Sequence, residues 1–177
     1  MEKAIDFLRK KGQKIAAKRG DRDAREGLAI SKSHNEYGYL LCLNCETDFV
    51  AKNDDLGTFA NSLVDIAMKS ESNTLEDVLN QKYESSQLTV KEKITEQSGV
   101  IGEKIEISAF EKITAKKVVA YNHPGNQIAT IVGLTIDEEE VGKQVAMQVA
   151  AMNPIALDQQ SVSQDVIDRE IEVGKDL

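Results

Sequence analysis

Hydrophobic positions in the first half of the chain recur with two different periods, which predicts strands followed by helices. Residues 27–34 have a weak period of two, and residues 39–45 form a dense apolar run. The segment between them, 35–38, supplies the turn residues of a β-hairpin. The density of the second run predicts a strand buried on both faces, and the regular alternation at 104–110 predicts a third strand.

Helical spacing connects this hairpin to the third strand. Apolar residues recur every three or four positions from about 56 to 69, and a shorter helical segment is predicted at 75–79. Another helix is predicted at 89–97, where Thr89 and Glu92 have the spacing of a capping box. The first half therefore combines a small antiparallel sheet with helices.

The second half repeats the order of a hairpin followed by an amphipathic helix. Residues 118–121 and 128–136 predict two strands joined by a turn at 123–126. The acidic residues 137–140 suit the start of a helix, because carboxylates are favourable at the positive end of the helix dipole. The apolar residues of that helix share one face: Val141, Val145, Val149 and Met152.

These patterns predict an α+β fold with two related subdomains, in which each small antiparallel sheet is a hairpin plus a strand covered by helices. A short N-terminal helix is expected at 2–11, ended by Gly12. The expected divisions are a helical segment with its linker at 1–26, a first subdomain at 27–113 and an incomplete second subdomain at 114–177.

Charge is distributed unevenly along the 177 residues. The first 26 carry nine Lys and Arg against five Asp and Glu, a net charge of +4, so the remainder carries −12 for a total of −8. A body this acidic repels phosphate, which argues against nucleic acid as a partner. No apolar run is long enough to span a membrane, and two cysteines without an export signal are typical of a cytoplasmic protein.

No arrangement of residues typical of an active site stands out, so we expect neither an enzyme nor a bound cofactor or metal. Cys42 and Cys45 have the spacing of a metal or redox pair, but residues three apart in a strand point to opposite faces. His34 and His123 are expected at hairpin turns in different halves of the fold. We interpret both cysteines as buried structural thiols, with a zinc or redox domain as the alternative.

The strand at 39–45 and the helix after it are joined by a corner with a large apolar side chain. Thr47 or Asp48 can cap the start of a helix, and the Asp48 carboxylate also suits the helix dipole. Phe49 and Val50 follow at once, where a solvent-facing helix usually carries polar residues. The ring of Phe49 is therefore either a staple into the protein's own core or a group offered to a partner, and composition alone favours the staple.

The sequence around this corner resembles a family signature. Residues 44–53, Asn-Cys-Glu-Thr-Asp-Phe-Val-Ala-Lys-Asn, are similar to the signature of elongation factor Ts, the nucleotide exchange factor of the GTPase elongation factor Tu. The resemblance continues in the family's order through further segments: 4–17, 27–35, 123–125 and 145–154. It implies guanine-nucleotide exchange in translation elongation as the function, with elongation factor Tu as the partner.

The resemblance also implies a contact that displaces the magnesium ion of the GTPase. That contact would consist of Thr47, Asp48, Phe49 and Val50. Within it, the Phe49 ring is expected to act as a wedge between helices of the GTPase, and Asp48 is expected to orient the corner and meet partner groups. Phe49→Ala would then impair exchange without unfolding the chain.

A second contact, with the far domain of the GTPase, is implied at Ile128, Ala129 and Gln148. Ala129 stands where Gly is usual in the family, which adds a methyl group at a close approach. Gln148 stands where His is frequent, which replaces an imidazole by an amide.

Parts of the family's usual chain have no counterpart in this sequence. The earlier N-terminal helices and the end of the second subdomain are absent. We expect either a trimmed piece or a protein that lost these parts, with trimming favoured, and in both cases weaker GTPase binding. A sheet edge and an apolar helix face would be left uncovered, so a homodimer is an alternative. The alternative function is a small α+β interaction or dimerisation module without exchange activity, with Phe49 in its own core.

Overall fold

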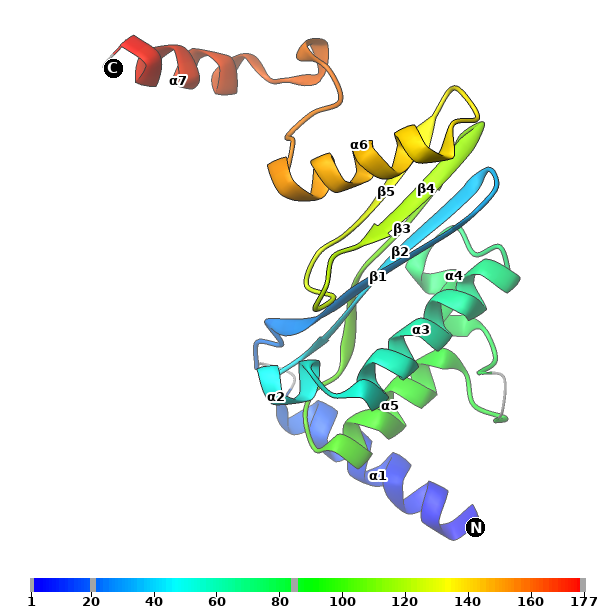
Figure 1. Ribbon diagram of the computed structural model, residues 1–177. Coiled ribbons are helices and arrows are strands. Elements are labelled where there is room, and N and C mark those ends of the chain that lie inside the picture. The colour runs from blue at the N-terminus through cyan, green and yellow to red at the C-terminus, as the bar shows by residue number, and fades with distance from the viewer. Residues whose placement is uncertain (1, 20–21, 84–85, 176–177) are drawn as a thin grey trace.

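The computed structural model describes residues 2–19, 22–83 and 86–175 and has the predicted α+β fold. Its elements are α1 (Glu2–Arg19), β1 (Glu26–His34), β2 (Tyr37–Cys45), α2 (Asp48–Ala51), α3 (Asp54–Lys69), α4 (Leu75–Asn80), α5 (Val90–Ile101), β3 (Glu106–Thr114), β4 (Lys117–Asn122), β5 (Ala129–Leu134), α6 (Glu139–Met152), the 3-10 turn η1 (Gln159–Ser161) and α7 (Gln164–Lys175). They lie in layers (Figure 1): α6 covers the hairpin β4–β5, the hairpin lies on the sheet β1-β2-β3, and α3 and α5 cover the other face of that sheet. Helix α1 packs along α5.

Strand β2 is the centre of the first sheet and pairs antiparallel with β1 and β3, so the predicted hairpin and third strand are confirmed. The prediction that this strand is buried on both faces was wrong. Tyr39, Leu41 and Leu43 on the helix side are at most 2% exposed, whereas Leu40 and Cys42 on the other face are half-buried. The reason is that the hairpin β4–β5 covers only part of that second face, and a groove stays open beside it.

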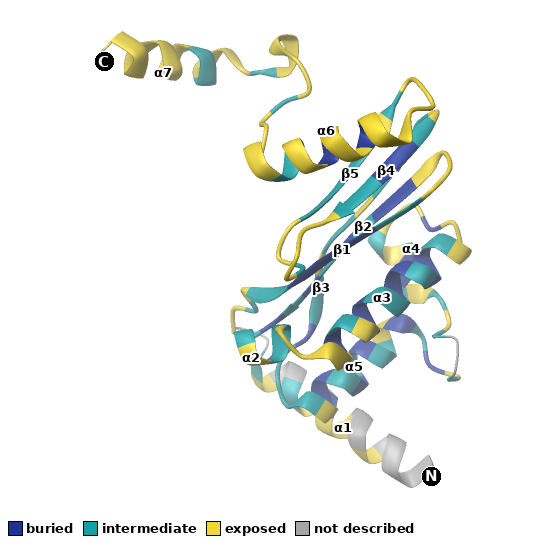
Figure 2. Ribbon diagram, in the orientation of Figure 1, coloured by how far each residue is buried: buried dark blue, intermediate teal, exposed yellow. Residues whose placement is uncertain are grey.

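The main core lies between the first sheet and helices α3, α4 and α5. Figure 2 shows the buried residues gathered on β1, β2 and the inner sides of these helices. Full burial of one large apolar side chain stabilises a fold by about 1.5–3 kcal/mol. The largest fully buried side chains of this core are Leu41, Leu43, Leu63, Val64, Val78 and Val90.

In the described residues the second sheet has two strands, β4 and β5, which form a hairpin. The hairpin was predicted, and the additional strand predicted for this sheet is not among the described residues. Polar side chains join it to the edge of β1. Asn122 Oδ1 accepts a hydrogen bond from Ser31 N (2.7 Å), and Asn122 Nδ2 donates one to Ser31 O (2.9 Å). In the turn, Asn126 O accepts a bond from Ala29 N (2.7 Å). One amide side chain thus takes the place of a neighbouring strand and links two separate sheets.

Helix α6 docks on this hairpin through its small residues. Gly142 and Ala146 are buried against the strands, and a Cβ atom at Gly142 would lie 2.5 Å from Val119 Cγ2. Only a residue without a side chain permits this approach. Much of the apolar face predicted from the helical period is exposed to solvent, at Val141, Val145 and Met152, in line with the expected uncovered helix face.

Helix α1 continues through Gly12, so the prediction that Gly12 ends a helix at residue 11 was wrong. Gly12 is buried where α1 crosses α5, and a Cβ atom there would lie 1.9 Å from Thr95 O. A glycine inside a helix costs about 1 kcal/mol relative to alanine, but here it lets two helix backbones touch. Neither α1 nor any other helix of the described part is long and apolar enough to cross a membrane.

Candidate functional site

The corner between β2 and α3 contains the four-residue helix α2. Thr47 caps α2, because its Oγ1 accepts a hydrogen bond from Val50 N at 3.5 Å. Asn53 caps α3 in the same way, through a bond from Asp55 N to Asn53 Oδ1 at 2.8 Å. The predicted cap at Thr47 therefore starts a separate short helix, and α3 has a cap of its own.

The side chain of Phe49 is 83% exposed. Composition favoured a staple into the protein's own core, and the structure contradicts that interpretation. Val50 and Ala51 pack against the core instead. Neighbouring helical residues point about 100° apart, so a turn anchored through Val50 directs the ring of Phe49 into solvent.

Asp48 lies beside this ring and pairs with Lys52 one helical turn later. Lys52 Nζ donates a hydrogen bond to Asp48 Oδ2 at 2.7 Å, and this bond lowers the pKa of Asp48. The Asp48 side chain is still 47% exposed. The corner therefore presents an apolar ring next to a carboxylate that stays ionised at neutral pH.

Glu46 ties this corner to α1. Its carboxylate accepts two hydrogen bonds from Arg19 Nη1 at 2.8 Å, one from Arg22 Nη1 at 3.1 Å and one from Lys104 N at 2.8 Å. The Glu46 side chain is 9% exposed. Burial by itself raises the pKa of Glu46, but these hydrogen bonds outweigh it and bring the pKa to about 2.

We expect Glu46→Gln to lower the free energy of unfolding near neutral pH by about 2 kcal/mol, less than the full pKa shift because both arginines are partly solvated. The folded-state pKa lies below the ordinary value of 4.5, so the carboxylate stabilises the fold above that pH and loses this effect as the pH falls toward 2. Urea unfolding from about pH 7 to about pH 3 should show the difference between native chain and variant shrinking with acid. A difference that stays constant would contradict the ion pair. Glu106→Gln is the control. It removes an ion pair with Lys104 in which the glutamate side chain is 43% exposed, so the free energy of unfolding should change little.

A second carboxylate, that of Glu103, holds the backbone of the corner. Its Oε2 accepts hydrogen bonds from Glu46 N and Thr47 N, each at 3.1 Å, and its Oε1 accepts one from Thr47 Oγ1 at 2.6 Å. The sequence analysis missed Glu103, which follows α5 and lies 57 and 56 positions after its two partners. No local pattern connects the two segments, so the sequence carried no signal for this contact.

The residues of the predicted second contact lie on the outer layers of the molecule. Ile128 is 45% exposed beside the turn of the hairpin, Ala129 begins β5, and Gln148 is exposed on α6. The hairpin and α6 pack together, with a hydrogen bond from Thr130 Oγ1 to Ala146 O at 3.0 Å. Figure 1 shows α6, which carries Gln148, and α2 on opposite sides of the first sheet. The hairpin turn next to Ile128 lies closer to the Phe49 corner, because Gly125 and Asn126 line a groove with Ala51, Lys52 and Asn53.

Cys42 and Cys45 point to opposite faces of β2, as the alternation along a strand predicts. Cys45 belongs to the core, and Cys42 lines a groove on the face away from the helices. Burial raises the pKa of both thiols, that of Cys45 to about 11. A protonated thiol is a poor nucleophile and metal ligand. Among the described residues, no group of three or more His, Cys, Asp or Glu could hold a metal ion.

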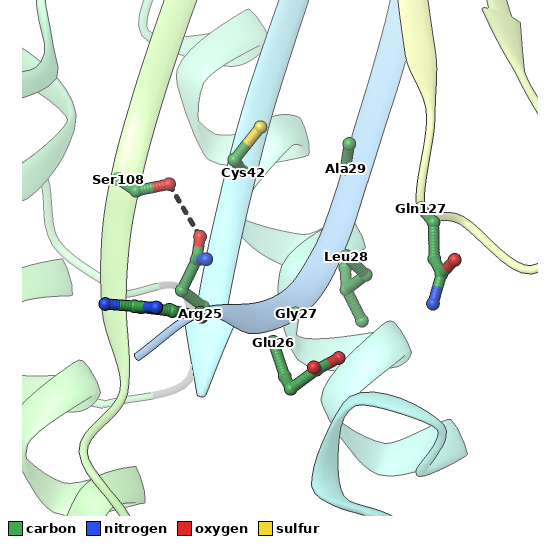
Figure 3. A pocket seen from close by; sticks show the side chains of 9 residues that line it. Arg25, Glu26, Gly27, Leu28, Ala29, Cys42, Ser108 and Gln127 are labelled. Carbon is green, nitrogen blue, oxygen red and sulfur yellow. Dashed lines mark hydrogen bonds between the residues drawn. The ribbon is translucent and has the colours of Figure 1, made fainter. Parts of the chain in front are cut away.

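The groove beside Cys42 crosses the first sheet near the start of β1 (Figure 3). Two of its polar groups bond to each other: Ser108 Oγ donates to Asn44 Oδ1 at 2.6 Å. Asn44 Nδ2 in turn donates to Ala24 O at 3.1 Å. Because the amide of Asn44 is bonded at both ends, the groove does not present it to a ligand.

Comparison with known proteins places the chain among the translation elongation factors. It belongs to the elongation factor Ts family, whose model, "Elongation factor TS", matches residues 46–176. The chain is 52% identical to elongation factor Ts of Christiangramia forsetii, over 98% of this chain and 64% of the relative. It is 43% identical to that of Amoebophilus asiaticus (99% and 65%) and 40% identical to that of Parabacteroides distasonis (98% and 53%). The resemblance found in the sequence is confirmed, and the chain spans less than two thirds of the length of each relative.

Proposed function

We propose that the chain acts as a guanine-nucleotide exchange factor in translation elongation, which binds elongation factor Tu and promotes GDP release by disturbing its magnesium and phosphate site. The observation that carries this proposal is the ring of Phe49, 83% exposed at the corner that bears the family signature. When a partner buries an apolar ring that was exposed to water, the free energy of the complex is lowered. The capped turn also fixes the direction in which the Cα–Cβ bond of Phe49 points.

The proposed mechanism needs no chemical step from the chain. If the chain binds the GTPase more tightly when nucleotide is absent, reciprocity of coupling requires that it weaken nucleotide binding. Magnesium neutralises the phosphates of a bound nucleotide, so moving the segments that hold it weakens GDP binding. In this proposal the ring of Phe49 enters between helices of the GTPase and moves those segments. Asp48 orients the corner and meets partner groups, while Thr47 and Val50 complete the contact.

Ile128, Ala129 and Gln148 supply the second contact in this proposal, with the far domain of the GTPase. The position of Gln148 on α6, across the first sheet from α2, supports two separate points of attachment on one partner. The proposal places the chain in the cytoplasm, without catalysis or a cofactor of its own. A net charge of −8 opposes binding to nucleic acid.

The test is the release of a fluorescent GDP analogue from elongation factor Tu with the chain added, at low and at high magnesium concentration. We expect faster release, with the largest acceleration at high magnesium, because there the ion limits spontaneous release. If the chain binds elongation factor Tu without accelerating GDP release, it is a docking module and the proposed exchange function is wrong.

A second candidate function is favoured by the exposed apolar face of α6 at Val141, Val145 and Met152. Such a face suits a small interaction or dimerisation module without exchange activity. This candidate predicts no binding to elongation factor Tu and a dimer in sedimentation experiments. The version of it that placed Phe49 in the protein's own core is contradicted by the exposure of the ring.

A further inference from the structure

Two carboxylates hold two segments of the chain together at the exchange corner, which comprises residues 46–50 between β2 and α3. Glu103 accepts hydrogen bonds from the backbone N–H groups of Glu46 and Thr47, and Glu46 accepts one from the backbone N–H of Lys104. Each segment thus holds the backbone of the other. Residues 46–47 and 103–104 are therefore expected to move as one body.

The segment that carries Glu103 is itself firmly held. Helix α5 ends at Gly102, which adopts a left-handed conformation with φ of 89°. Just beyond it, Ile105 N donates a hydrogen bond to Ser98 Oγ at 3.1 Å, and Ser98 Oγ donates one to Ile94 O at 3.1 Å. Ser98 and Ile105 are buried. Glu103 thus projects from a segment that is bound back onto a core helix.

The direction in which the Phe49 side chain leaves the molecule, by contrast, is set by the backbone of α2. The ring is 83% exposed, so side-chain packing contributes little to its orientation. The ring stands on α2, and a helix of four residues is not stable by itself. What fixes α2 at its start is the cap at Thr47.

The hydroxyl group of Thr47 connects this cap to Glu103. It donates its proton to Glu103 Oε1 at 2.6 Å and accepts the hydrogen bond from Val50 N. Because the proton is committed to Glu103, a lone pair of Thr47 Oγ1 is directed to the first turn of α2. Removing the carboxylate would free the hydroxyl to rotate and would release two backbone N–H groups of the corner.

We propose that Glu103 is a positioning residue of the exchange corner, which holds Thr47 and thereby sets the direction in which Phe49 enters the GTPase. This inference rests on the proposed exchange function and deepens it. Glu103 acts through Thr47 and the two backbone N–H groups, whereas Phe49 makes the contact with the partner.

The test measures GDP release against chain concentration, which separates the maximal rate from the half-saturating concentration. We expect Glu103→Ala to lower the maximal rate about tenfold, because small misplacements of a positioned group have effects of this size or larger. A role confined to stability would reduce the folded fraction and raise the half-saturating concentration, with the maximal rate unchanged. An unchanged maximal rate therefore overturns the proposal.

Two further variants and a control sharpen this test. Glu103→Gln should lose less of the maximal rate than Glu103→Ala, because its carbonyl oxygen still accepts from both N–H groups, while its NH2 group can donate to Thr47 Oγ1 but cannot accept the hydroxyl proton. Glu103→Asp is one methylene shorter, so it should lose rate as Glu103→Ala does, and it replaces that variant if alanine prevents folding. Glu111→Ala removes an exposed carboxylate of β3 and should leave the rate unchanged.

Amide hydrogen exchange of the chain alone separates this proposal from the proposed function. In Glu103→Ala the amides of Glu46 and Thr47 should exchange at least about tenfold faster, while that of Leu41 in the core keeps its protection. Unchanged protection at the first two amides overturns the role of Glu103. If the native chain itself fails to accelerate GDP release, the exchange function is lost, and the amide data still decide whether Glu103 holds the corner.

Discussion

Phe49→Ala is expected to slow chain-promoted GDP release from elongation factor Tu on the order of a hundredfold, the size of effect seen when a central aromatic residue of an interface is truncated. The free energy of unfolding of this variant should lie within about 0.5 kcal/mol of that of the native chain, because the Phe49 ring is 83% exposed and surface substitutions have small effects. The measurement combines release rates at saturating chain concentration with urea unfolding. The variant should therefore lose exchange activity and keep its stability.

The matched control for this experiment is Phe7→Ala. Phe7 lies on α1 and is 67% exposed, so the control removes the same ring from a second exposed position. Its maximal release rate should equal that of the native chain. If Phe49→Ala instead loses about 3 kcal/mol of stability, the ring packs in the protein's own core, and if it releases GDP at the native rate, the wedge lies elsewhere.

Gly12→Ala is expected to destabilise the chain by about 2–3 kcal/mol, a typical cost of forcing an extra group into a packed contact. The new Cβ atom would lie 1.9 Å from Thr95 O and 2.9 Å from Thr95 C, which are backbone atoms of α5 and cannot rotate away. Helix α1 must therefore move off α5, although alanine favours an isolated helix by about 1 kcal/mol over glycine. Urea unfolding gives the loss, and limited trypsin digestion reports the release of this Lys- and Arg-rich helix.

Gly57→Ala is the control, with an effect of opposite sign. Gly57 lies within α3, and a Cβ atom there would meet no atom within 4 Å. Alanine should therefore raise the free energy of unfolding by up to about 1 kcal/mol. If Gly12→Ala were as stable as Gly57→Ala, the close crossing of α1 and α5 would be wrong.

The elements that the sequence predicted correctly are those with a local signal. The hairpins follow from alternation and turn residues, and α5 begins with the predicted capping box, in which Thr89 and Glu92 bond to each other's backbone. The end of α1 was placed wrongly at Gly12 because a glycine that stops a helix and one that permits a helix crossing look alike in sequence. What distinguishes them is Thr95, which is distant in the chain.

The candidate site was predictable only in part. The signature identified the corner and its cap at Thr47, but composition could not decide which of Phe49 and Val50 faces the core. That choice depends on the direction in which α2 leaves β2. The hydrogen bonds between Glu46, which follows β2, and the segment of Glu103 and Lys104, which follows α5, hold the backbone at this point. These two carboxylates act through contacts that span 56 to 58 positions, which no periodicity or motif of the sequence encodes.

The join between the two sheets has a consequence for how the molecule opens. It consists of the hydrogen bonds of Asn122 and its neighbours and of a small apolar contact, in which Val118 and Ile131 meet Gly38 of β2. The main apolar core lies on the other face of the first sheet, against the helices. The hairpin and α6 can therefore detach as a sub-global unit at a lower free energy than complete unfolding requires. Thermal fluctuations then loosen the surface of Ile128 and Gln148 more often than they disturb the Phe49 corner. A partner that binds the Phe49 corner and the surface of Ile128 and Gln148 at the same time would suppress this opening. It would also keep the hairpin and α6 in one arrangement relative to the first sheet.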